Sequence, residues 1–134
     1  MKCELLSLIE AYCTKAENLV PRLAMALNIK LPITNLEWAA LDIKTSGTTN
    51  DGLGYFKHGF GVEIQFKGGI IDIDFGNNGE YKGFDAWRLY KFAKESRIDT
   101  RYKNEIDLKN DIIQAQSLGQ LHYAGHLYYL NKKD

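Results

Sequence analysis

The segment GGIIDIDFGNNG, residues 68–79, places two carboxylates in an apolar run. In a strand, Asp72 and Asp74 point to the same face, with α-carbons about 6.6 Å apart. That spacing suits a pair that shares a divalent cation or a water in metal-assisted hydrolysis, with His58 as a general base. It equally suits docking against a basic partner, where charge speeds association and fixes register. The third interpretation is a solvated strand face.

Two other histidines have a spacing that could hold a metal. His122 and His126 are four residues apart, like zinc ligands on a helix. However, Tyr123 stands where the motif has Glu, and Gly125 weakens a helix between the histidines. We therefore expect no metal and no cofactor.

The cysteines favour a reducing compartment. Cys3 and Cys13 lie ten residues apart on a predicted helix, which is about 15 Å of rise. A disulfide needs α-carbons roughly 4.4–6.8 Å apart, so both are expected to be free thiols. Neither has a nearby His in sequence that would suggest a cysteine nucleophile. With no secretory signal pattern and no 18-residue apolar run, the expected location is cytoplasmic.

Composition indicates one globular domain. The 134 residues are 45% hydrophobic and 25% charged, which is the globular average. Seventeen basic and 17 acidic residues give a formal net charge of zero, which argues against broad binding of nucleic acid or of anionic membrane. The glycine-rich segments match neither the Walker nor the dinucleotide-binding pattern.

The clearest predicted element is a hairpin over residues 60–75. Apolar and polar residues alternate in FGVEIQF and IIDIDF, which is the period of a strand. A Gly68-Gly69 loop would pair Phe66 with Ile71 and Glu63 with Asp74. Glu63, Asp72 and Asp74 would then form an outward acidic face with no basic residue among them.

Helices are expected on either side of this hairpin. An apolar stripe predicts a helix over 3–28, which Pro21 either kinks or divides. Asn35 could cap a short helix, and Asp85 is well placed to cap another that ends near Ser96. A last helix is expected over 103–118, and HLYYL near the end could add a strand; the candidate core residues of that helix are Ile106, Ile112, Ile113 and Leu118.

The predicted fold is therefore α+β. A small antiparallel sheet is built on the central hairpin, and the N-terminal and C-terminal helices pack on its apolar face. Tyr128 and Tyr129 belong either to the core or, if exposed beside the acidic face, to an interface where Tyr is a common anchor.

Three motifs carry a resemblance to a known family: HGFG at 58–61, DIDFG at 72–76 and GFDAWRL at 83–89. Over about residues 55 to 95 the chain resembles a family of small bacterial immunity-like proteins. The resemblance implies a single-domain protein that neutralises a toxin made by the same or a rival bacterium. It supplies no catalytic residues.

The leading hypothesis is a non-enzymatic immunity protein that binds a cognate toxin protein domain, with no nucleic acid or membrane as direct partner. Its carboxylates would mimic phosphates against a basic nuclease cleft. The predicted contact residues are Glu63, Asp72, Asp74, Glu80, Tyr128 and Tyr129. The alternatives are a metal-dependent hydrolase that uses Asp72, Asp74 and His58, and a regulatory module whose partner is not a toxin.

Overall fold

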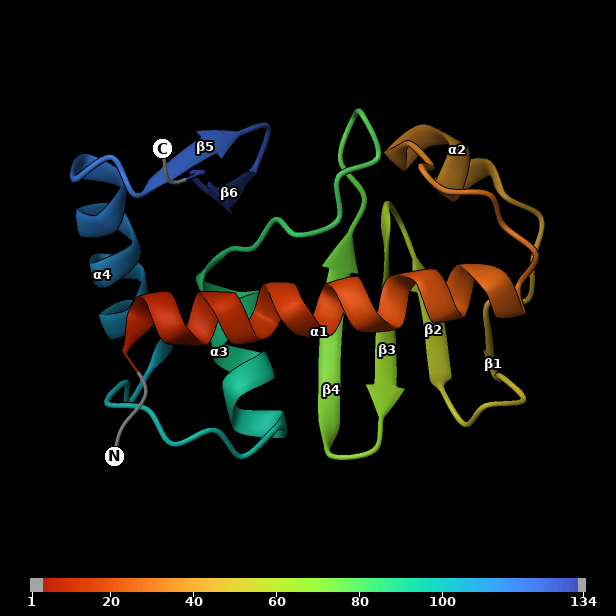
Figure 1. Cartoon of the computed structure of the whole chain (residues 1–134), viewed down its shortest axis with the longest axis horizontal. Helices are drawn as coiled ribbons and strands as arrows, with labels where there is room; N and C mark the ends of the chain where they lie inside the picture. Colours follow the sequence, from red (N-terminus) through yellow and green to blue (C-terminus); the bar gives the residue numbers. More distant parts are fainter. Residues whose placement is uncertain (1–3, 133–134) are drawn as a thin grey trace.

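The computed structural model describes residues 4–132; residues 1–3, which include Cys3, and residues 133–134 lie outside the described part. Its elements confirm an α+β fold (Figure 1). In chain order they are α1 Leu5–Ala26, α2 Asn35–Ala40, β1 Ser46–Thr48, β2 Gly54–His58, β3 Gly61–Phe66, β4 Gly69–Asp74, α3 Ala86–Glu95, α4 Glu105–Ser117, β5 Leu121–Ala124 and β6 Leu127–Leu130.

Strands β1 to β4 form an antiparallel sheet in sequence order. The side chains of Val62, Ile64, Ile71 and Ile73 are fully buried on one face, as the period of a strand requires. Helix α1 crosses this face (Figure 1) and contributes its own apolar stripe to the same core. The buried residues of that helix are Leu5, Leu8, Ile9, Tyr12, Ala16, Leu19, Val20, Leu23 and Ala24.

The predicted register of the β3–β4 hairpin is wrong by two residues. Phe66 pairs with Gly69, and Glu63 pairs with Asp72, each two residues before the predicted partner. A shift of two keeps every side chain on its predicted face, whereas a shift of one would reverse them all. The apolar and acidic faces are therefore as predicted.

The loop explains the difference in register. It consists of Lys67 and Gly68, and of these Gly68 alone has a positive φ, at 107°. This pattern matches a type II turn, which requires a positive φ only at its second central residue. Gly69 belongs to the strand, where a β-carbon would collide with the side chain of Ser96. The close approach of the end of α3 thus places Gly69 in β4.

Helix α1 runs through Pro21 without ending, so Pro21 does not divide the predicted helix. Its Tyr12 is fully buried and donates its hydroxyl to the backbone oxygen of Asp72 at 2.5 Å and to that of Gly83 at 3.2 Å. These two bonds join α1 to the end of β4 and to the segment that leads into α3.

Helix α3 lies beside the edge strand β4, and α4 lies beyond α3 (Figure 1). The predicted core of α4 is wrong at three of its four positions. Ile112 is buried, but Ile106, Ile113 and Leu118 are 69%, 47% and 66% exposed. Leu108, Ile112 and Ala115 face inward instead, at the i, i+4, i+7 spacing of one helical face.

Two smaller elements also differ from expectation. Thr34, rather than Asn35, caps α2, through a capping box with Glu37. The C-terminal HLYYL segment does not join the main sheet. It contributes β6 to a separate two-stranded sheet with β5, held to the chain before α3 by a bridge between Phe84 and Tyr128.

Candidate protein-binding surface

The sheet face opposite α1 carries the acidic residues of the predicted site. Phe56 on β2 pairs with Glu63 on β3, which pairs with Asp72 on β4. Directly paired residues point to the same face, so these three side chains form a row across the sheet. Phe56, His58 and Gln65 are exposed. Solvent therefore reaches this face over β2 and β3.

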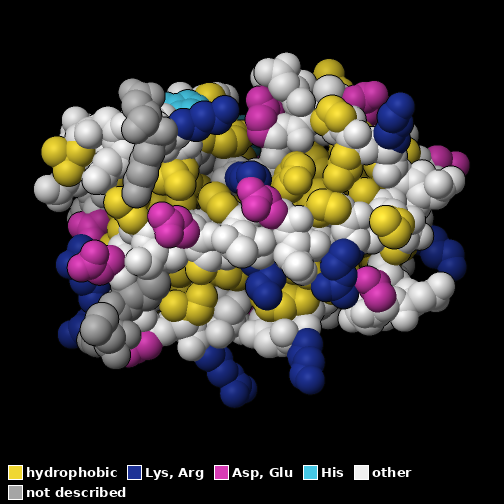
Figure 2. Space-filling model, viewed as in Figure 1, with side chains coloured by type: hydrophobic (Ala, Val, Ile, Leu, Met, Phe, Trp, Pro, Cys, Tyr) yellow, Lys and Arg dark blue, Asp and Glu magenta, His cyan; other side chains and the backbone are white. Residues whose placement is uncertain are grey.

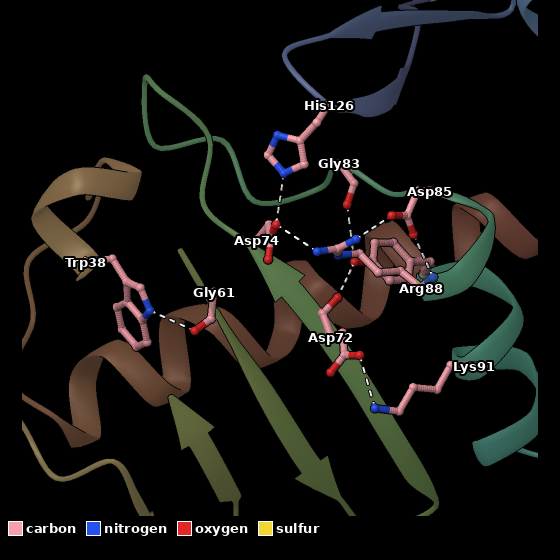
Figure 3. Close-up of polar contacts among 10 residues, drawn as sticks. Trp38, Gly61, Asp72, Asp74, Gly83, Asp85, Arg88, Lys91 and His126 are labelled. Carbon is pink, nitrogen blue, oxygen red and sulfur yellow. Dashed lines mark hydrogen bonds and ion pairs between the residues drawn. The ribbon is translucent and has the colours of Figure 1, made fainter. Parts of the chain in front are cut away.

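Helix α3 supplies a cation to this row. The Nζ of Lys91 lies 2.8 Å from Oε1 of Glu63 and 3.1 Å from Oδ2 of Asp72. Figure 3 shows Lys91 reaching from α3 to Asp72 on β4. The hairpin itself supplies no basic residue to this face, as expected, but Lys91 from the next element along the chain pairs with its carboxylates.

A second cation bridges two more carboxylates (Figure 3). Arg88 places Nη2 2.8 Å from Oδ2 of Asp74 and Nη1 2.5 Å from Oδ2 of Asp85. Asp85 also caps α3 as predicted, since its Oδ1 accepts from the backbone N–H of Arg88 at 2.8 Å. Asp74 is buried, with 7% of its surface exposed. It is thus a structural partner of α3 and not part of a solvated face.

These ion pairs lower the pKa of the carboxylate of Glu63 and raise the pKa of the basic side chains of Lys91 and Arg88. The hydrogen bond from Lys91 holds the pKa of Glu63 below its usual range, against the smaller effect of burial. Burial opposes the charge of Lys91, but its bonds to Glu63 and Asp72 raise its pKa above the usual value. Burial likewise opposes the charge of Arg88, and Asp74 and Asp85 nevertheless raise its pKa. At neutral pH these groups form ion pairs.

We call these six residues the acidic cluster: Glu63, Asp72, Asp74, Asp85, Arg88 and Lys91. Four carboxylates and two cations give it a net charge of −2 at neutral pH. The side chains of Glu63 and Asp85 are 24% and 34% exposed, whereas those of Asp72 and Asp74 are 12% and 10% exposed. Glu63 and Asp85 are therefore the carboxylates that a partner can reach most easily.

Two exposed aromatic side chains flank the acidic cluster. Phe56, next to Glu63 in the row, is 49% exposed, and Trp87 on α3 is 52% exposed. Trp87 comes one helical turn before Lys91, so the two side chains lie on neighbouring positions of the helix surface. Large aromatic residues around a charged centre are the composition of many protein interfaces.

Gly61, the last residue of the HGFG segment, is a glycine because of its close contact with β4. It pairs with Asp74, and a β-carbon at Gly61 would collide with the backbone oxygen of Ile73 and with Oδ1 of Asp74. The indole N–H of Trp38 donates to the backbone oxygen of Gly61 at 2.8 Å (Figure 3). A glycine at this position thus leaves room for the Asp74 carboxylate to reach Arg88.

The other predicted contact residues lie elsewhere. Tyr128 is half-buried and stacks on Phe84 at 6.4 Å between ring centroids. Glu80 and Tyr129 line a cavity together with Leu6 and residues further along α1, on the side of the sheet that α1 covers. The structure therefore divides the six predicted contact residues between two sides of the molecule.

The histidines are also placed differently from expectation. His126, not His58, contacts Asp74, with Nε2 3.1 Å from Oδ2 (Figure 3). His58 is exposed and lies near Phe56, at 6.2 Å between rings. His122 stands on β5 and bonds through Nδ1 to the side chain of Asn131 at 2.5 Å. The i, i+4 pair is thus in a hairpin and not on a helix.

The two carboxylates predicted to share a metal ion, Asp72 and Asp74, are each paired with a basic side chain of the protein. Lys91 and Arg88 occupy the positions next to Asp72 and Asp74 that a divalent ion would need. Within residues 4–132 no group of three or more His, Cys, Asp and Glu side chains is arranged to hold a metal ion. Over the same residues, no helix has the length and apolarity needed to cross a bilayer.

Sequence reasoning missed the two cations, although part of the signal was present. Arg88 and Lys91 stand three and six residues after the predicted cap Asp85, so they share a side of α3. That spacing identifies a basic helix face directly after an acidic strand. Their pairing with β4 depends on where α3 packs, which local patterns do not define.

The chain was compared with known families, curated proteins and solved structures. No curated protein and no solved structure matches it. A family described as a domain of unknown function, DUF6896, matches residues 5–130. That match includes the acidic cluster, both flanking aromatic residues and the C-terminal hairpin, and it spans nearly every residue that the structure describes; the chain belongs to the DUF6896 family.

Proposed function

We propose that the protein is an immunity protein that binds and neutralises a cognate bacterial toxin domain in the cytoplasm, without chemistry of its own. The observation that supports this most is the acidic cluster flanked by Phe56 and Trp87 on an open sheet face. Exposed aromatic side chains around a charged centre are the composition from which many protein interfaces are built.

The charge of the cluster favours a cationic protein surface as the partner. A net charge of −2 attracts Lys and Arg side chains and repels phosphates, so nucleic acid is disfavoured as a direct ligand. A basic nuclease cleft has the complementary charge. In this proposal Glu63 and Asp85 contact the partner, and Asp72 and Asp74 hold Lys91 and Arg88 in position.

The first experiment identifies the partner. The tagged protein is isolated from its producing cells, washed at high salt, and its stoichiometric partner is identified by mass spectrometry. The proposal expects a partner that is toxic when expressed alone and harmless when this protein is co-expressed. A stoichiometric partner with no toxicity would contradict the immunity function and would favour a regulatory module.

A hydrolase is the second candidate, and the contact between Asp74 and His126 favours it. A buried carboxylate holds Nε2 of His126, whose side chain is 56% exposed and lines a cavity of about 360 Å³. Such an arrangement can hold an imidazole ready to take a proton from water. It differs from the expected metal pair because it uses His126 in place of His58.

The hydrolase candidate is tested with p-nitrophenyl acetate and bis(p-nitrophenyl) phosphate, with and without Mn²⁺. It expects release of p-nitrophenol that His126→Ala abolishes and His58→Ala leaves unchanged. His58 is a suitable control because it is exposed and lies outside the Asp74 contact. Release equal to buffer, or equal loss in both variants, would eliminate this candidate.

A further inference from the structure

A second candidate site lies on the other side of the molecule from the acidic cluster. A cavity of about 720 Å³ opens between α1, the chain segment at residues 80–82 and strand β6. Figure 2 shows apolar side chains gathered on this side of the molecule, above α1. Pockets for small organic ligands typically measure roughly 300–1,000 Å³ and are mostly apolar with a few polar groups.

The walls of this cavity are apolar and aromatic. Leu6 and Cys13 on α1 face Tyr81, Tyr129 and Leu130 from the C-terminal half of the chain. Cys13 is a half-buried free cysteine whose weak hydrogen bond goes to the backbone oxygen of Lys82 at 3.9 Å. Two tyrosine rings and aliphatic side chains suit a flat apolar body.

The charges at the edge of the cavity are unequal. Its lining contains the carboxylates of Glu10, Glu17 and Glu80 and the ammonium groups of Lys82 and Lys132, and Glu17 is paired with Lys82. Burial, and then Glu17 and Glu10, raise the pKa of Cys13 to about 11 despite an opposite effect of Lys82. Burial, and then Glu80, raise the pKa of Tyr129. The lining therefore has one more carboxylate than ammonium groups.

We propose that this cavity binds a small organic cation that carries a primary ammonium on a flat apolar body about the size of an indole. The apolar body packs between Leu6, Tyr129 and Leu130. The ammonium is attracted by Glu10 and Glu80, whose exposed carboxylates line the edge of the cavity, and such pairs contribute modestly. The site adjoins the cavity that His126 lines, because Glu80, Tyr129 and Leu130 line both cavities. The proposal does not depend on the immunity function.

The test uses three indoles that share a two-carbon side chain and end in an ammonium, a hydroxyl or a carboxylate group: tryptamine, tryptophol and indole-3-propionate. Each is titrated into the full chain while backbone amide signals are followed by NMR. The proposal expects shifts at Cys13, Tyr81 and Leu130 and tryptamine binding about five-fold tighter than tryptophol. Indole-3-propionate is expected to bind more weakly than both. Equal affinities for all three, or shifts that map elsewhere, would overturn the proposal, and so would the absence of shifts.

Two variants separate charge from shape. The double substitution Glu10→Gln and Glu80→Gln should lower tryptamine affinity to that of tryptophol and leave tryptophol affinity unchanged. Glu95→Gln, which removes an exposed carboxylate outside the cavity, should change neither. Leu6→Trp, which fills the cavity, should abolish binding of both probes. Tryptamine binding that survives Leu6→Trp would contradict the assigned location.

A shortened chain tests whether residues outside the described part affect this cavity. A chain that ends at Lys132 should bind tryptamine as the full chain does. Binding that appears only after residues 133–134 are removed would show that the terminus fills the cavity and would overturn the proposal.

Discussion

At the scale of single residues, the structure changes the role of the predicted acidic site. Asp74 is the carboxylate held most firmly, because it is buried and contacts the side chains of both Arg88 and His126. A buried carboxylate with two partners contributes to the stability of the fold, because removal of one partner leaves its charge uncompensated. Charge reversal at Asp72 and Asp74 would therefore test the packing of α3 as well as binding.

Loss of Arg88 should be costly to stability. Arg88→Ala leaves Asp74 buried without its guanidinium partner, and we expect unfolding to become easier by about 3–5 kcal/mol. The measurement is urea unfolding at neutral pH. Arg22→Ala removes an exposed pair with Asp51, and we expect a loss below about 1 kcal/mol. Equal losses in the two variants would show that the Arg88 pairs contribute no more than a surface pair.

The pairing of Glu63 with Lys91 predicts a pH dependence. Because the hydrogen bond from Lys91 lowers the pKa of Glu63 from its usual value of about 4.5, the contribution of Glu63 to stability is present above about pH 4.5. It is lost as the pH falls through the lowered pKa. Glu63→Gln should therefore be less stable than the parent protein near neutral pH, and the difference should shrink in acid. The measurement is the urea midpoint of both proteins at several pH values. A constant difference across this range would contradict the linkage.

At the scale of elements, the site depends on the junction of β3, β4 and α3. Gly61 permits the close approach of β3 to Asp74, the cap Asp85 starts α3, and Tyr12 ties α1 to the end of β4. The acidic cluster is thus held by three consecutive elements, which α1 from the start of the chain ties together. A disturbance of strand spacing should reach the cluster directly.

Gly61→Ala should show this dependence. Its β-carbon would collide with the backbone oxygen of Ile73 and with the Asp74 carboxylate, so we expect a loss of about 1–3 kcal/mol of stability from overpacking. Gly54→Ala is the matched control on the same face, because its β-carbon would mainly meet the flexible side chain of Gln65, at 3.2 Å. We expect a change below about 1 kcal/mol there. Thermal unfolding measures both, and a larger loss in the Gly54 variant would contradict the geometry.

At the scale of the whole molecule, α1 covers one sheet face and leaves the opposite face open over β2 and β3 (Figure 1). The molecule therefore has two distinct surfaces of interest. One is the acidic cluster with its flanking aromatic residues, and the other is the cavity beside α1. Each has its own variants, so failure of one proposal leaves the other standing.

Local patterns predicted the α+β class, the two faces of the hairpin and the cap at Asp85, because alternation and capping depend on neighbouring residues. They did not predict that α3 would cover Asp74 or that Ile106 and Ile113 would be exposed, since these depend on packing between distant elements. The prediction of the hairpin register was wrong for the same reason, because it depends on a contact with another element. Gly69 is required by contact with Ser96, and not by the turn.

The measurement that tests the central claim most directly is the affinity of the captured toxin domain for the double variant Phe56→Ala and Trp87→Ala. Two interface anchors that each contribute about 2 kcal/mol predict a loss of roughly 1,000-fold. Ile113→Ala, an exposed apolar residue on α4, should bind like the parent protein. If the double variant binds as tightly as the parent, or if Ile113→Ala alone weakens binding, the toxin does not dock on the open face of the sheet.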